Sequence, residues 1–118
     1  MEDRDYDVVI AGGGPAGNEA AYNLALQNFD VLVLESDSYI GETKQSTGGT
    51  FPEMMTSFGI DPDETTMSRT SKAVIEGPEE KLVADRPGYV LEFGDFKRYQ
   101  ADRAQENGAD YLLDSNVI

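Results

Sequence analysis

Three glycines near the amino terminus have the spacing that lets bare backbone approach a phosphate. They are Gly12, Gly14 and Gly17, within the run Gly12-Gly13-Gly14-Pro15-Ala16-Gly17. In a G-x-G-x-x-G motif the first glycine permits a tight turn, the second leaves room for a pyrophosphate, and the third allows close helix packing. The N–H groups at the start of the following helix would then face the phosphates with a partial positive charge. The motif therefore predicts a dinucleotide-binding turn.

One acid follows these glycines at a distance suited to holding a ribose. Glu35 lies 21 residues after Gly14, close to the roughly 20-residue spacing expected of a ribose-binding carboxylate. Such a carboxylate accepts hydrogen bonds from both ribose hydroxyls and repels a 2′-phosphate, which disfavours NADP at this site. Without the glycines, Glu35 would be one solvated acid among the 23 in the chain. The fingerprint serves FAD and NAD alike.

The segments around the motif have the pattern of a βαβ unit. Residues 6–11 form a β-branched run that ends in glycines, and residues 31–34 form a second continuous apolar run. Between them, small and apolar residues recur at helical spacing over 14–26, and Asn28 follows as a residue that tolerates left-handed backbone. Uninterrupted apolar strands are typical of a parallel sheet covered on both faces. The pattern predicts an α/β, Rossmann-like fold.

The rest of the chain predicts one small antiparallel hairpin and one long helix. Segments 73–76 and 81–84 flank Gly77-Pro78 and are expected to pair as the hairpin, to which 89–91 would add a third strand. The other expected elements are a loop over 41–50, a short helix over 51–58, a helix over 95–107 closed by Gly108, and a strand from 111 to 113. Because the chain stops at Ile118, soon after that strand begins, we expect an incomplete domain.

Composition excludes several kinds of chemistry. The 118 residues include no cysteine and no histidine, which excludes disulfides, thiolate or imidazole metal sites, and Ser-His or Cys-His catalysis. No metal site is expected, and no catalytic side chain is assigned. A net charge of −14 argues against a nucleic-acid-binding surface.

The same composition predicts the salt conditions and the cellular location of the protein. Densely scattered acids with only four lysines resemble the proteins of salt-loving archaea, in which molar salt screens self-repulsion; the alternative is an ordinary acidic protein. The polar start of the chain lacks the features of a signal peptide, and no apolar run has the length of a membrane span. A cytoplasmic location is expected, with the oligomeric state and peripheral membrane contact left open.

Together these motifs resemble the geranylgeranyl reductase family of flavoproteins, including the archaeal digeranylgeranylglycerophospholipid reductases. Residues 5–17 are similar to the family's opening, and the similarity continues through 31–35, the Lys44–Gly49 loop and 96–110. The resemblance implies FAD as cofactor, with NAD(P)H or ferredoxin as electron donor. It also implies a small-molecule or isoprenoid lipid substrate, whose double bonds reduced FAD would saturate.

The resemblance also assigns residues to the cofactor. The backbone N–H of Ala16 would bind the pyrophosphate, Glu35 the adenosine ribose, and the backbone of Val117 the adenine, while the 46–49 loop would meet the flavin side. The full set of expected cofactor-binding residues is Gly12, Gly13, Gly14, Pro15, Ala16, Gly17, Glu35, Ser46, Thr47, Gly49 and Val117.

Two departures from the family pattern accompany this assignment. Many archaeal members have a cysteine where this chain has Ser46, so a thiol-dependent role is lost. The family's arginine ahead of the long helix aligns with Phe93, which leaves open whether Lys97 or Arg98 replaces its contact.

The resemblance further implies that residues 1–118 are the N-terminal part of an FAD-binding domain. The family's second FAD motif, a Gly-Asp segment, and most of its substrate domain lie beyond them. Three alternatives stay open at this point. They are a non-catalytic remnant of such a flavoprotein, a monooxygenase of the aromatic hydroxylase type, and a simple NAD-binding Rossmann module.

Overall fold

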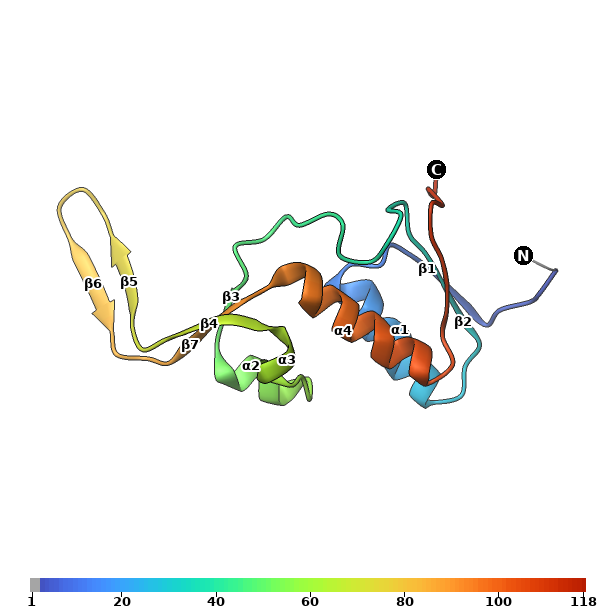
Figure 1. The fold of residues 1–118 in the computed structure, drawn as a ribbon, viewed down its shortest axis with the longest axis horizontal. Coiled ribbons are helices and arrows are strands. Elements are labelled where there is room, and N and C mark those ends of the chain that lie inside the picture. The colour runs from blue at the N-terminus through green and yellow to red at the C-terminus, as the bar shows by residue number, and fades with distance from the viewer. Residues whose placement is uncertain (1–2) are drawn as a thin grey trace. The chain divides into compact units, whose positions relative to one another are not determined.

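A computed structural model describes residues 3–118 and divides them into two compact units (Figure 1). The first unit comprises the chain up to Lys44 together with Lys97–Ile118, and the second comprises Gln45–Phe96. The first unit therefore contains both ends of the chain, and it carries the glycine motif.

The first unit is built on a three-stranded parallel sheet. Its strands are β1 (Val8–Ala11), β2 (Val31–Leu34) and β8 (Asp110–Leu112), in the order β1-β2-β8. Helix α1 (Pro15–Leu26) connects β1 to β2, and α4 (Phe93–Glu106) precedes β8. The βαβ unit and the parallel sheet are thus confirmed.

The core of this unit lies between the sheet and the two helices. It is made largely of small side chains, which let the helices approach the sheet closely. The buried members are Ala21, Ala25, Val31, Val33, Ala104 and Ala109, with Ile10, Tyr22, Leu24 and Tyr111 packed against them.

The opposite face of the same sheet is only partly covered by the described part of the chain, because Leu32 of the central strand is 8% exposed while residues of the two outer strands are more open. Val9 and Leu112 are 56% and 36% exposed on it, although parallel sheets are normally covered on both faces. Within residues 3–118, β1 also has a strand neighbour on one side only.

Helices α1 and α4 begin and end close to the predicted residues. Helix α1 has Gly14 as its N-cap and Pro15 at its first position, where a missing N–H costs nothing. Asn28, just after it, has a φ of 66°, so the expected left-handed residue is confirmed. Helix α4 begins two residues earlier than predicted, and Gly108 follows it with a φ of 108°.

The second unit contains two antiparallel sheets. Strands β3 (Gly49–Thr50), β7 (Gly88–Leu91) and β4 (Thr66–Thr70) form one sheet in the order β3-β7-β4, and β5 (Ala73–Glu76) pairs with β6 (Lys81–Ala84) in the other. Two short helices, α2 (Pro52–Ser57) and α3 (Pro62–Thr65), lie between β3 and β4 in the chain.

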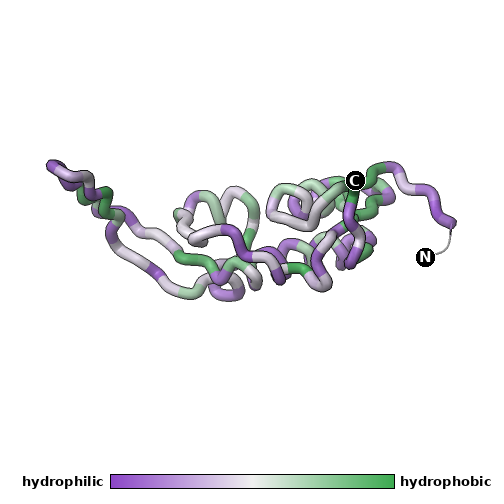
Figure 2. The backbone as a smooth tube through the Cα atoms, turned by 90° about the horizontal axis from the view of Figure 1, so that it is seen from above, coloured by the Kyte–Doolittle hydropathy of each residue, from purple (hydrophilic) through white to green (hydrophobic). Residues whose placement is uncertain are grey.

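The β5–β6 hairpin is confirmed, but its expected third strand is wrong. Residues 89–91 do form a strand, yet β7 pairs with β3 and β4 and not with the hairpin. The hairpin stands apart with exposed apolar residues such as Ile75 and Leu82, and its tip is hydrophilic (Figure 2). Strand β4 escaped prediction because the sequence Thr-Met-Ser-Arg-Thr has no apolar alternation.

No helix among residues 3–118 is both long enough and apolar enough to cross a membrane.

Candidate dinucleotide-binding site

The glycine loop continues the sheet and then turns directly into α1. The N–H of Gly12 donates to the carbonyl of Leu34 at 2.8 Å, which extends the pairing of β1 with β2 by one residue. Gly12 then adopts a φ of 104°, a conformation that favours glycine. The N–H of Asn18 donates to the carbonyl of Gly14 at 2.9 Å and closes the first turn of the helix. The tight turn predicted at Gly12 is therefore present.

The other two glycines of the motif are required for different reasons. A Cβ at Gly17 would overlap the carbonyl oxygen of Gly12 and lie 3.3 Å from Cγ2 of Ile10. Gly17 thus allows the start of α1 to lie against both the loop and β1. A Cβ at Gly14, in contrast, would meet no described atom within 4 Å. The space beside Gly14 is open, as the approach of a pyrophosphate requires.

The carboxylate of Glu35 points into this loop from the end of β2. It is only 9% exposed, and its Oε2 accepts a hydrogen bond from the N–H of Gly13 at 2.6 Å. Its Oε1 accepts from the N–H of Asp37 at 3.0 Å and from the hydroxyl of Ser36 at 3.1 Å. Burial alone would raise the pKa of Glu35, but these three hydrogen bonds outweigh it and hold the pKa below its ordinary value. The acid is therefore ionised at neutral pH.

A cleft of about 220 Å³ lies at the carboxyl ends of the parallel strands, where ligands bind in open α/β sheets. It brings Glu35 together with Val117, although these residues are 82 positions apart in the chain. The N–H of Ser115 donates to the carbonyl of Glu35 at 2.8 Å and ties the segment after β8 to this edge. The cleft is lined by Ala11, Gly12, Leu34, Glu35, Ser36, Ser115, Asn116 and Val117.

Pro15 and Ala16 are the first two residues of α1, so the N–H of Ala16 is among the first-turn groups that lack an intrahelical partner. Ser46, Thr47 and Gly49 belong to the second unit. There the N–H of Gly48 donates to Oγ of Ser46 at 3.0 Å, and Gly49 begins β3. Their role at the flavin side stays a prediction.

Sequence reasoning missed a group of buried polar side chains that join α4 to the rest of this unit. Lys97 is 7% exposed, and its Nζ donates to the carbonyl of Thr43 at 2.9 Å. Gln100 is 3% exposed, and its Nε2 donates to the carbonyl of Pro15 at 3.3 Å. The signal available in the sequence was their three-residue spacing, which puts both on one face of a helix.

An ion pair extends the same contact between α4 and α1. Arg103 lies 2.7 Å from Glu19, with 13% and 18% of the two side chains exposed, and its guanidinium lies 4.1 Å from the ring centre of Tyr22. This largely buried pair differs from the exposed pair of Lys72 with Asp85, which is 3.7 Å long.

We expect Glu19→Ala to lower the free energy of unfolding by about 1–3 kcal/mol, because it removes a carboxylate that pairs with a largely buried guanidinium. Urea denaturation in molar KCl measures the change. Asp85→Ala is the matched control and should cost less than about 1 kcal/mol, because an exposed pair contributes little and salt screens it. An equal loss of unfolding free energy in the two variants would show that burial does not strengthen the contribution of the Glu19–Arg103 pair.

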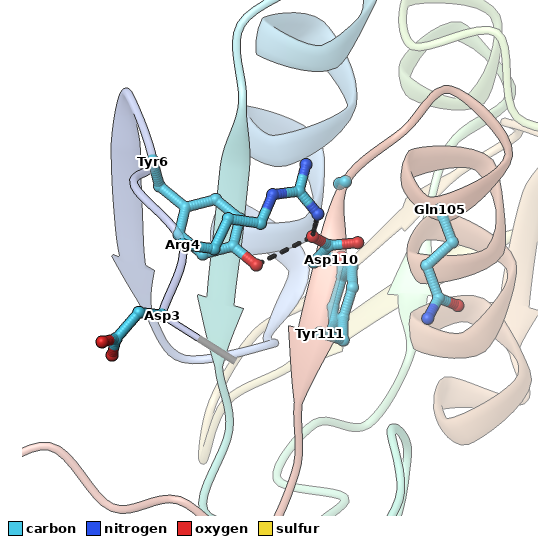
Figure 3. A pocket seen from close by; sticks show the side chains of 7 residues that line it. Asp3, Arg4, Tyr6, Gln105, Asp110 and Tyr111 are labelled. Carbon is cyan, nitrogen blue, oxygen red and sulfur yellow. Dashed lines mark hydrogen bonds and ion pairs between the residues drawn. The ribbon is translucent and has the colours of Figure 1, made fainter. Parts of the chain in front are cut away.

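A larger hollow of about 740 Å³ lies at the opposite end of the sheet (Figure 3). Arg4, which lines this hollow, lies 2.6 Å from Asp110, and the hydroxyl of Tyr6 donates to the same carboxylate at 2.8 Å. This hydrogen bond is the main cause that raises the pKa of Tyr6. Among the described residues that line the hollow, Arg4 is the only basic one, and its guanidinium is already paired with a carboxylate. These contacts attach the segment before β1 to β8.

Comparison with known proteins gives one family match and many relatives. The Thi4 family matches residues 2–61. The chain is 47% identical over 116 residues to a digeranylgeranylglycerophospholipid reductase of Haloferax volcanii, covering 96% of the chain and 28% of that protein. It is 40% identical over 112 residues to digeranylgeranylglycerophospholipid reductase 2 of Methanothermobacter thermautotrophicus, covering 91% of the chain and 29% of that protein.

Solved structures with a similar fold are also found. A geranylgeranyl bacteriochlorophyll reductase-like protein from Thermoplasma acidophilum matches with a TM-score of 0.86 and 28% identity, over 96% of the chain and 31% of that protein. The myxobacterial FAD-dependent chondrochloren halogenase shares the fold with a TM-score of 0.77 at 17% identity, over 96% of the chain and 29% of that protein. The chain spans less than a third of the length of these relatives.

Proposed function

The chain belongs to the Thi4 family, and its resemblance to the geranylgeranyl reductases is confirmed; from this premise we propose that it binds FAD at the β1–α1–β2 unit. The observation that carries the proposal is the ionised carboxylate of Glu35 held against the loop at Gly13, beside open space at Gly14. An acid in this position can take the ribose hydroxyls while the loop receives the diphosphate.

Each residue of the site would then have one task. The N–H of Ala16 would donate to the pyrophosphate, where the partial positive charge of the helix start favours an anion. Glu35 would accept from the ribose, and the backbone of Val117 would meet the adenine in the cleft that both residues line. In the second unit, the loop from Ser46 to Gly49 would contact the flavin side. FAD supplies hydride and electron transfer when it is bound, so a chain without histidine or cysteine is suited to it.

The reaction proposed for the whole protein is reduction of the isoprenoid double bonds of a lipid, with electrons from NAD(P)H or ferredoxin. Support comes from two relatives named as digeranylgeranylglycerophospholipid reductases. We also propose that residues 1–118 form the N-terminal FAD-binding part of a longer polypeptide. The greater length of the relatives and the exposure of Val9 and Leu112 on the two outer strands of the sheet support this division.

Calorimetric titration of the purified protein in molar KCl tests the proposed cofactor. FAD is expected to bind, and NADH is expected to bind much more weakly in a parallel titration. Tighter binding of NADH would favour a simple NAD-binding module instead, and no uptake of either nucleotide would favour the non-catalytic alternative.

The charge of Glu35 leads to a pH prediction. Because its pKa in the folded protein lies below the ordinary value of about 4.3, the ionised acid stabilises the fold above that pH. The contribution is lost as the pH falls through the lower, folded pKa. Urea denaturation between pH 7 and pH 3 should therefore show a shallower loss of stability in Glu35→Gln than in the wild type.

The same variant should bind FAD about tenfold more weakly, because a neutral amide accepts hydrogen bonds from ribose less strongly than a carboxylate. Glu80→Gln, in the exposed loop of the hairpin, is the control and should change neither the pH profile nor the affinity. If the free energy of unfolding fell with pH equally steeply in Glu35→Gln and the wild type, the hydrogen bonds assigned to Glu35 would be contradicted.

A further inference from the structure

The side chain of Asn18 is completely buried beneath the glycine loop, and every one of its polar atoms has a partner. Its Nδ2 donates to the carbonyl of Gly13 at 3.1 Å and to the carbonyl of Lys97 at 3.2 Å. Its Oδ1 accepts from the hydroxyl of Tyr111 at 2.7 Å. One side chain therefore connects the loop to both α4 and β8.

We infer that Asn18 is a positioning residue for the pyrophosphate, which it serves by fixing the peptide between Gly13 and Gly14. This inference rests on the proposed FAD site. In a trans peptide the C=O and N–H groups point in opposite directions. Since Asn18 holds the carbonyl of Gly13 on the buried side, the N–H of Gly14 is turned away from that side. The position where a Cβ of Gly14 would lie is open.

Gly13 is held from both directions by this arrangement. Its N–H donates to Glu35 at 2.6 Å, and its carbonyl accepts from Asn18. Glycine has the widest choice of backbone conformations, so these two hydrogen bonds restrict a residue that would otherwise have more conformational freedom. Ordering the loop in advance lowers the entropic cost of binding a diphosphate.

The hydroxyl of Tyr111 completes the orientation of the Asn18 amide. Gly13 and Lys97 both present carbonyl oxygens, so only the NH₂ group can face them, and Oδ1 is left for Tyr111. Burial, with a smaller contribution from Asp102, raises the pKa of Tyr111 well above its ordinary value. The hydroxyl therefore stays protonated and remains a donor.

The test compares Asn18→Ala and Tyr111→Phe with Ala25→Gly. The control changes a core residue of the same helix that is 5% exposed and destabilises α1 without touching the loop. Two quantities are measured at a temperature where each variant is folded. One is the affinity for FAD, and the other is hydrogen exchange of the ligand-free protein, comparing residues 11–17 with β2.

Asn18→Ala is expected to weaken FAD binding by about tenfold or more, and Tyr111→Phe is expected to weaken it less, since the two donor bonds remain. Both variants should speed hydrogen exchange in the loop while β2 stays protected. Ala25→Gly should neither weaken FAD binding nor speed exchange in the loop.

The inference would be overturned if Ala25→Gly and Asn18→Ala, at the same loss of melting temperature, weakened FAD binding equally. It would also be overturned if hydrogen exchange in the loop were unchanged in Asn18→Ala. Should Asn18→Ala fail to fold, Tyr111→Phe decides by the same two measurements. A wild-type protein that takes up no FAD would instead overturn the proposed function, while exchange in the ligand-free protein still tests whether Asn18 holds the loop.

Discussion

Replacing Gly14 with valine is expected to abolish FAD binding while the protein stays folded. Gly14 has φ −83° and ψ −176°, an extended conformation that any residue adopts. A Cβ there meets no described atom within 4 Å, so the fold has room for the side chain. That same room is where the pyrophosphate would lie, so valine would exclude the ligand by direct overlap.

We expect the affinity of Gly14→Val for FAD to fall more than 100-fold, equivalent to a loss of more than about 2.7 kcal/mol. Stability should change by less than about 1 kcal/mol, since Gly14 caps α1 without a side-chain hydrogen bond. Flavin titration measures the first quantity and urea denaturation the second. A variant that binds FAD as tightly as the wild type would show that the pyrophosphate lies elsewhere.

Gly17→Ala is expected to have the opposite effect and to destabilise the fold itself. The added methyl group would overlap the carbonyl oxygen of Gly12, which is backbone and already part of a tight turn. Overpacking of this kind costs about 1–3 kcal/mol and occasionally more. Because no flexible side chain can yield here, we expect a loss of about 3 kcal/mol or more.

Thermal and urea denaturation of Gly17→Ala measure this loss, and Gly14→Ala is the matched control, because it adds the same methyl group where the structure is open. A wild-type melting temperature in Gly17→Ala would mean that α1 does not approach the loop this closely. Variants at Gly14 and Gly17 therefore distinguish a role in ligand binding from a role in helix packing.

The second unit shows where prediction from sequence reached its limit. The hairpin of β5 and β6 was predictable, because its turn and both strands lie within twelve residues. The sheet of β3, β7 and β4 was not, because Gly49 pairs with Val90 and Thr66 with Leu91 across long stretches of chain. Nothing in the short, exposed segment Thr66–Thr70 marks it as a strand.

The candidate site likewise combines features set by local sequence with contacts between distant segments. Local spacing was enough to predict the turn at Gly12, the helix from Pro15 and the acid at Glu35, since strand, loop and helix follow one another directly and constrain each other through short-range geometry. Only tertiary folding decides that Tyr111, 93 residues further on, donates to Asn18, and that Val117 shares a cleft with Glu35. These contacts arise because β8 pairs beside β2, and which distant segment takes that place depends on the burial of a whole core, which no local pattern encodes.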